Sequence, residues 1–128
     1  MPNELVISIV DDDQSVRAGT KDLLKAMGFI AKAFERADEF LRSDCLGDTC
    51  CLIADMRMPG MTGLELHNHL ASSRHRIPTI LITAFPNERD RKRAVKAGVA
   101  CYLSKPFNED ELLACIHTAL GSSQSSGR

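Results

Sequence analysis

The sequence has little of what marks a membrane, secreted or nucleic-acid-binding protein. Its charges nearly cancel, with 16 Lys and Arg against 17 Asp and Glu, so it lacks the strongly basic balance that favours binding to a phosphate backbone. No apolar run approaches the ~20 residues of a membrane span. The first residues, from Met1 onward, lack the basic and then apolar order of a signal peptide. We therefore expect a cytoplasmic protein, with no membrane partner and no direct binding of nucleic acid by this segment.

The sequence also lacks the paired spacing of metal-ligating or redox cysteines. It has five cysteines, an odd number, and no C-x-x-C pair. Because free cysteine is usually buried, we expect reduced and mostly buried thiols. The four histidines form no metal pattern either, since His67 and His69 lie two apart on a predicted helix and point in different directions. They are expected to be structural.

What remains is a chain of 128 residues, 44% hydrophobic and 26% charged, which is typical of one globular domain. Short runs rich in Val and Ile alternate with segments of helical spacing. We predict strands over 5–10, 29–34, 50–54, 78–82 and 99–103, and helices between the N-cap Asp13 and Gly28 and over 38–42, 63–71, 88–97 and 109–120. Strict alternation predicts parallel crossovers, and hence an open α/β sheet with helices on both faces.

The last seven residues differ from the rest of the chain. Residues 122–128 are rich in Ser and contain no apolar residue, which is typical of a flexible linker or tail. We therefore divide the chain into a domain over 1–121 and a tail over 122–128.

Reactive side chains follow four of the five predicted strands. Asp11 and Asp12 follow the first strand, Asp55 the third, Thr83 the fourth and Lys105 the fifth. Ligands of open parallel sheets bind at the carboxyl ends of the strands, and clustered carboxylates require a cation. Mg²⁺ suits such oxygen ligands best.

This constellation predicts phosphoryl transfer. Asp55 would be the nucleophile toward phosphorus, and Lys105 and Thr83 would contact phosphoryl oxygens. Each residue alone also has a structural explanation, since a strand-end Thr often forms a turn and a Lys before Pro is often solvated. Asp13, which follows the acidic pair, is expected only to cap the next helix.

Four segments carry these residues: Ile9-Val-Asp-Asp-Asp13, Ala54-Asp-Met-Arg-Met-Pro-Gly-Met-Thr-Gly63, Leu81-Ile-Thr-Ala84 and Tyr102-Leu-Ser-Lys-Pro-Phe107. In this order, from about Val6 to Leu120, they resemble the receiver domain of two-component response regulators, a signalling switch rather than an enzyme. The second segment is most similar to the FixJ-type transcriptional branch. The resemblance implies a flavodoxin-like, doubly wound sheet of five parallel strands in the order 2-1-3-4-5, with five helices.

The resemblance also implies the role of each acidic residue. Asp55 would accept a phosphoryl group from a phosphohistidine of a sensor histidine kinase. Asp12, Asp55 and the backbone carbonyl of Arg57 would hold Mg²⁺, with Mn²⁺ as an alternative, and Asp11 would act through a metal-bound water.

Further roles concern the end of the fifth strand. Thr83 and Lys105 would bind the phosphoryl oxygens, and the peptide between Lys105 and Pro106 would be cis. Thr83 and Tyr102 would form the family's switch, in which the Tyr102 ring turns inward. Alternatively, Tyr102 is an aromatic side chain of an edge strand that packs on the last helix.

The helix over 88–97 is basic and has few apolar residues, so shallow packing is expected. We predict that this helix, the fifth strand and the last helix form the face for an output domain or a homodimer. Phe85 and Pro86 before it are bulkier and stiffer than the small loop that is common in the family.

Other functions remain open. The output is expected to be transcriptional, through a DNA-binding domain absent from this sequence, but a stand-alone receiver that signals by docking is an alternative. The segment from Asp11 to Asp13 also resembles the Asp-x-Asp nucleophile motif of haloacid-dehalogenase-type phosphatases. Such an enzyme would depend on Asp11 and Asp13 and be indifferent to Asp55.

Overall fold

The computed structural model describes residues 5–125, and its centre is a five-stranded parallel sheet in the order β2-β1-β3-β4-β5. The strands are β1 (Val6–Val10), β2 (Ile30–Phe34), β3 (Thr49–Asp55), β4 (Thr79–Thr83) and β5 (Cys101–Ser104). The three inner strands are buried along almost their whole length, as their continuous apolar runs require. The predicted fold class and strand order are confirmed.

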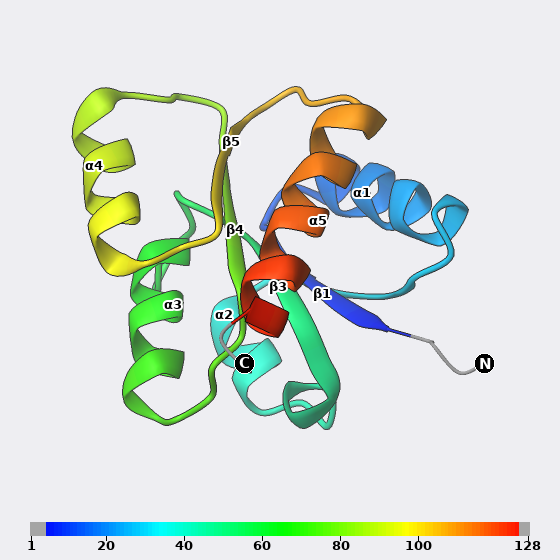
Figure 1. Ribbon diagram of the computed structural model, residues 1–128, viewed down its shortest axis with the longest axis horizontal. Helices are drawn as coiled ribbons and strands as arrows, with labels where there is room; N and C mark the ends of the chain where they lie inside the picture. Colours follow the sequence, from blue (N-terminus) through cyan, green and yellow to red (C-terminus); the bar gives the residue numbers. More distant parts are fainter. Residues whose placement is uncertain (1–4, 126–128) are drawn as a thin grey trace.

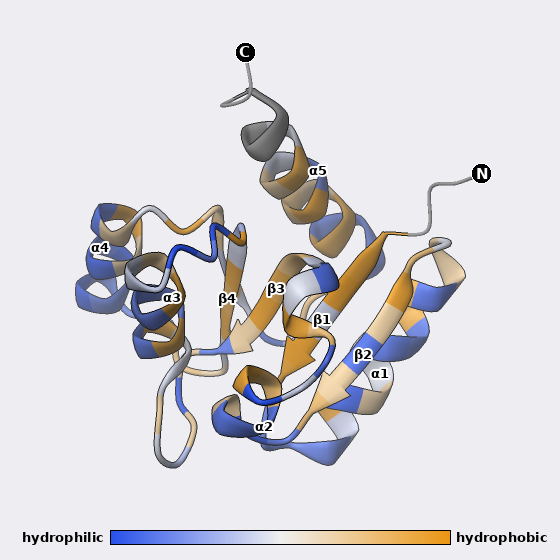
Figure 2. Ribbon diagram, turned by 90° about the horizontal axis from the view of Figure 1, so that it is seen from below, coloured by the Kyte–Doolittle hydropathy of each residue, from blue (hydrophilic) through white to orange (hydrophobic). Residues whose placement is uncertain are grey.

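Five α-helices cover both faces of this sheet (Figure 1). They are α1 (Gln14–Ala26), α2 (Ala37–Leu41), α3 (Gly63–Ser72), α4 (Glu88–Ala97) and α5 (Glu109–Ser125). Side chains of α1 and α5 share one apolar core with the sheet, and side chains of α2, α3 and α4 share the other. Figure 2 shows that the strands are the most hydrophobic part of the molecule and that α4 is mainly hydrophilic.

Most predicted elements agree with the structure to within two residues, but α5 is longer than predicted. It continues to Ser125 instead of ending at Leu120. The apolar pattern ends at Leu120, but each further helical residue adds a backbone hydrogen bond without needing an apolar side chain. A short 3-10 helix over Leu46–Asp48 was not predicted. Residues 126–128 of the predicted tail lie outside the described residues.

The first turn of α1 positions the acidic residues that precede it. The Asp13 carboxylate caps this helix as predicted, by accepting the Ser15 N–H at 2.9 Å. Gly28 has the left-handed conformation expected after a helix, with φ of 94°.

Along residues 5–125 no helix has both the length and the apolar character to span a membrane.

Candidate functional site

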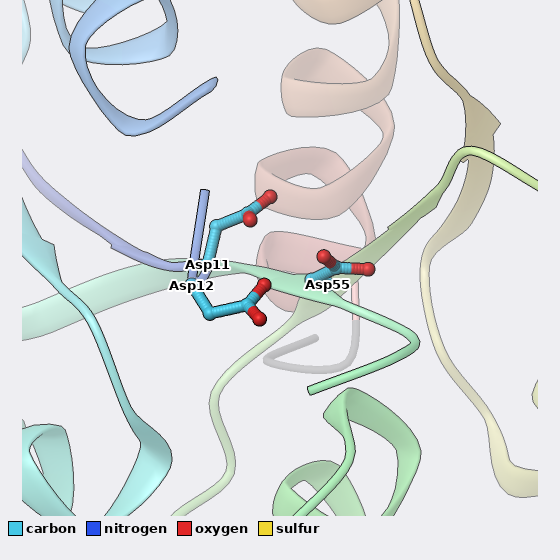
Figure 3. Close-up of side chains that lie close together, drawn as sticks. All are labelled: Asp11, Asp12 and Asp55. Atoms are coloured by element: carbon cyan, nitrogen blue, oxygen red, sulfur yellow. The ribbon is translucent and has the colours of Figure 1, made fainter. Parts of the chain in front are cut away.

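Three carboxylates converge at the carboxyl edge of the sheet. Asp11 and Asp12 follow β1, and Asp55 is the last residue of the neighbouring strand β3. Each offers one carboxylate oxygen, and these oxygens lie within 4.8 Å of one another. Figure 3 shows the three side chains directed toward a common space. The convergence predicted from the sequence is therefore present.

Lys105 brings the balancing charge from the far side of the sheet. Its ammonium Nζ lies 3.0 Å from Asp11 Oδ2 and donates a hydrogen bond to Asp55 Oδ2 at 3.1 Å. Burial lowers the pKa of Lys105, but the attraction of the two carboxylates outweighs burial and raises it above 10.5. The peptide between Lys105 and Pro106 is cis, as the resemblance implied.

Asp11 is the most enclosed of the three acids, with an exposed fraction of 0%. Its Oδ1 accepts the Asp13 N–H at 2.9 Å, whereas its Oδ2 receives no hydrogen bond from residues 5–125 despite the nearby ammonium. Burial is the main reason that the pKa of Asp11 is raised, and the negative charge of Asp55 adds to the effect. Mutual repulsion thus contributes less than burial.

The carboxylate of Asp55 is held from both sides. Its Oδ1 accepts the Arg57 N–H at 3.0 Å, and its Oδ2 pairs with Lys105. The side chain is 8% exposed, so a small part of it is accessible to solvent. These contacts fix the carboxylate at the sheet edge, where it can meet an incoming reactant.

Gly63, at the start of α3, is a site residue that the sequence reasoning missed. A Cβ at this position would collide with the Asp55 carbonyl oxygen and lie 2.9 Å from both the Asp55 carbonyl carbon and Leu81 Cδ2. Only glycine lets α3 approach the strand that carries Asp55. The available signal was its position at the end of the Pro/Gly-rich segment after β3.

Thr83 ends β4, the strand next to β3, and its side chain is fully buried. Its Oγ1 accepts the Phe85 N–H at 3.1 Å, which leaves the hydroxyl proton for another acceptor. The Thr83 carbonyl accepts the Lys105 N–H at 2.8 Å. Thr83 and Lys105 are therefore tied together at the same sheet edge as Asp55.

Tyr102 lies in β5 and is partly buried. It packs against the core shared by α3 and α4, so the alternative of packing on α5 is wrong. The sequence could not decide this, because an edge strand exposes both faces to possible helices. The Tyr102 hydroxyl accepts the Asn87 N–H at 3.4 Å and thus lies at the beginning of α4.

The remaining predicted residues point elsewhere. The Arg57 guanidinium lies 3.4 Å from Asp90 in α4, while the role of its carbonyl as a metal ligand stays a prediction. Asp13 is turned to its helix cap and is absent from the carboxylate cluster, so its carboxylate is not paired with that of Asp11 as the phosphatase alternative requires. The two ring nitrogens of His67 form hydrogen bonds with the Thr79 hydroxyl and the Ala97 carbonyl, which is a structural role as predicted.

The donor set suits a hard divalent cation. It consists of carboxylate oxygens within 4.8 Å of one another, one from an exposed residue and two from buried ones. The buried Asp11 Oδ2, which lacks a hydrogen bond from the described residues, is the kind of atom that a cation or its bound water satisfies. Asp11, Asp12 and Asp55 therefore fit Mg²⁺.

The helix α4 packs as shallowly as its composition predicts. Only Asp90 and Ala94 are buried along its length. Val95 is 63% exposed, and Phe85 in the preceding loop is 69% exposed. This side of the molecule presents a basic helix with isolated apolar side chains to its surroundings.

Comparison with known proteins gives consistent results. A family model described as response regulator receiver domain matches residues 7–117. The chain is 39% identical over 117 residues to the response regulator protein TmoT of Ectopseudomonas mendocina, covering 91% of this chain and 53% of TmoT. It is 33% identical over 128 residues to the transcriptional regulatory protein FixJ of Azorhizobium caulinodans, covering 100% of this chain and 61% of FixJ.

A solved structure extends the comparison to three dimensions. The crystal structure of FixJ-N superposes with a TM-score of 0.83 at 31% identity, covering 94% of this chain and 96% of that one. The chain spans little more than half the length of the curated relatives TmoT and FixJ.

Proposed function

The chain belongs to the family of response regulator receiver domains, and from this premise we propose that Asp55 is its phosphoacceptor. The single observation that carries the proposal is the convergence of Asp55 with Asp11, Asp12 and Lys105 at one edge of the sheet. The donor would be a phosphohistidine of a sensor histidine kinase. An Asp55 carboxylate oxygen would attack phosphorus, the phosphorus–nitrogen bond would break, and an acyl phosphate would form.

Positioning and charge would account for most of the rate of this transfer. The Arg57 N–H holds one carboxylate oxygen of Asp55 in place, so that the attacking group is already oriented. Lys105 and the free proton of the Thr83 hydroxyl would bind phosphoryl oxygens, on which negative charge accumulates. We therefore assign Lys105 and Thr83 to catalysis and to stabilisation of the product.

We assign the metal site to Asp12, Asp55 and the carbonyl of Arg57, with Asp11 acting through a bound water. When present, Mg²⁺ would neutralise the carboxylates and the incoming phosphoryl oxygens. Mn²⁺ has the same oxygen preference and is expected to substitute. Lys105 neutralises part of the cluster in the absence of a metal.

The output is proposed to pass through Thr83 and Tyr102 to the face formed by α4, β5 and α5. Support comes from the Tyr102 hydroxyl at the start of α4 and from the shallow packing of this helix, because weakly anchored elements change population readily. The face would bind an output domain or a second copy of the chain. FixJ is named a transcriptional regulatory protein, which supports transcription as the output.

The same proposal covers activity and location. The chain would catalyse only its own phosphorylation and dephosphorylation, as a switch in the cytoplasm. All five cysteines are free thiols, which agrees with a reducing compartment.

Phosphorylation is tested with acetyl phosphate and Mg²⁺, followed by intact-mass measurement. We expect the protein to gain the mass of one phosphoryl group. The Asp55→Asn variant, once circular dichroism has shown that it is folded, should gain none. Asp13→Asn serves as the matched control and should be phosphorylated normally. An unchanged mass of the unmodified chain, or phosphorylation of Asp55→Asn, would refute the assignment.

A further inference from the structure

The N-terminal end of α4 is held by polar contacts rather than by apolar packing. The N-cap Asn87 accepts the Asp90 N–H at 2.8 Å with its Oδ1 and donates from Nδ2 to Asp90 Oδ2 at 3.0 Å. The backbone N–H of the same Asn87 donates to the Tyr102 hydroxyl at 3.4 Å. Asn87 therefore joins the acidic side chain of α4 to the tyrosine of β5.

Asp90 also receives a contact from the loop that follows Asp55. The Arg57 guanidinium lies 3.4 Å from Asp90 Oδ2, and the side chain of Asp90 is 12% exposed against 57% for Arg57. A carboxylate this enclosed needs its partners, because an unpaired buried charge is costly. Arg57 and Asn87 supply two donors to the same oxygen.

The Arg57–Asp90 contact crosses an open space. A groove of about 830 Å³ lies between the loop after β3 and α4, and it is lined by residues that include Arg57 and Asp90. Side chains of α3 line the groove as well. Among the ion pairs of residues 5–125, only that of Arg57 with Asp90 joins the loop after β3 to α4.

Arg57 links this pair to the acceptor itself. Its backbone N–H donates to Asp55 Oδ1 at 3.0 Å, while its guanidinium contacts Asp90. The contacts therefore run from Asp55 through Arg57, Asp90 and Asn87 to the Tyr102 hydroxyl. This route avoids Thr83.

We propose that Arg57 and Asp90 couple the acceptor carboxylate to Tyr102 and the start of α4, with Asp90 as a positioning residue. The proposal rests on the proposed function of Asp55. A group added to Asp55 displaces the hydrogen-bonded Arg57 backbone, and the paired Asp90 carries the displacement to the helix cap. An element that both sites bias is the physical requirement for such coupling.

The coupling is measured by titrating Mg²⁺-loaded protein with beryllofluoride, a phosphoryl mimic, while recording backbone amide NMR spectra. Arg57→Ala and Asp90→Asn should each weaken beryllofluoride binding by about two- to fivefold, the range of a partly exposed ion pair. Each should also reduce the shifts of the Asn87 and Tyr102 amides. The double variant should bind beryllofluoride no more weakly than either single variant. Arg57→Lys should restore part of the amide shifts that Arg57→Ala loses.

His67→Leu provides the control at the opposite end of the helix. His67 Nε2 contacts the Ala97 carbonyl at 3.0 Å, at the end of α4, so its loss loosens the helix without touching the acceptor loop. Its effect should add to that of Asp90→Asn. Additive effects of Arg57→Ala and Asp90→Asn, or full responses in both, would overturn the coupling.

A second readout separates this inference from the proposed function. In the unphosphorylated, metal-free state, Arg57→Ala should shift the amide NMR signals of Asn87 and Tyr102 as Asp90→Asn does. If these shifts occur but beryllofluoride leaves the NMR spectrum of the chain without substitutions unchanged, the proposed function fails while the contact route stands. If Arg57→Ala leaves both amides unmoved, the route is refuted.

Discussion

Replacing Asp12 with Asn removes one of three negative charges without changing the size of the side chain. Its carboxylate lies within 4.8 Å of those of Asp11 and Asp55, and two such charges repel by about 1 kcal/mol in water. No contact of Lys105 with Asp12 compensates for this repulsion within the described residues. Allowing for solvent screening of an exposed side chain, we expect Asp12→Asn to raise the free energy of unfolding by about 1 kcal/mol in metal-free buffer.

Mg²⁺ should reverse the order of stability. At a concentration about ten times Kd, a ligand that binds only the folded state adds about 1.4 kcal/mol. The unmodified chain should gain this amount, and Asp12→Asn should gain little because it has lost a ligand. The assay is urea unfolding in EDTA and in Mg²⁺, followed by circular dichroism.

Asp13→Asn is the matched control for this experiment. Asp13 lies next to Asp12 but caps α1 and is not part of the carboxylate cluster, and Asn is as good a cap as Asp. This variant should keep the full gain from Mg²⁺. The electrostatic reasoning is refuted if Asp12→Asn destabilises the metal-free protein or keeps the full gain from Mg²⁺.

Further predictions concern the packing, pH dependence and thiols. Gly63→Ala should lower the free energy of unfolding by about 2 kcal/mol through overpacking. Gly19→Ala in α1, with open space around it, should instead raise it by about 0.5–1 kcal/mol. Urea unfolding compares the two variants, and equal effects would contradict the clash at Gly63. Because the pKa of Asp11 is raised above 3.8, its contribution to stability is present below that value and lost as pH rises through the folded-state pKa. Asp11→Asn should therefore lessen this loss in metal-free unfolding curves, and an unchanged slope would argue against it. Burial raises the pKa of Cys51 and raises that of Cys115 to about 12, so iodoacetamide at neutral pH should label both only after unfolding; mass spectrometry of the folded protein would reveal any exception.

Local chemistry was sufficient to predict much of the fold. Val- and Ile-rich runs specify buried strands because both of their faces must leave water, and α4 was predicted with the bounds observed. The end of α5 at Ser125 was not predictable, since its last turns follow from helix propagation without an apolar signal. The role of Gly63 was also hidden, because a glycine in a loop shows nothing of the backbone that it approaches.

The sequence by itself determined which side chains reach the carboxyl edge of the sheet, because each follows the end of a strand and parallel strands end together. It thereby specified Asp11, Asp12, Asp55, Thr83 and Lys105. Only the tertiary structure decided how these groups interact. Burial, more than repulsion, raises the pKa of Asp11, and Tyr102 packs toward α4. Such burial and contacts depend on elements distant along the chain, and neither residue type nor spacing specifies which surfaces meet.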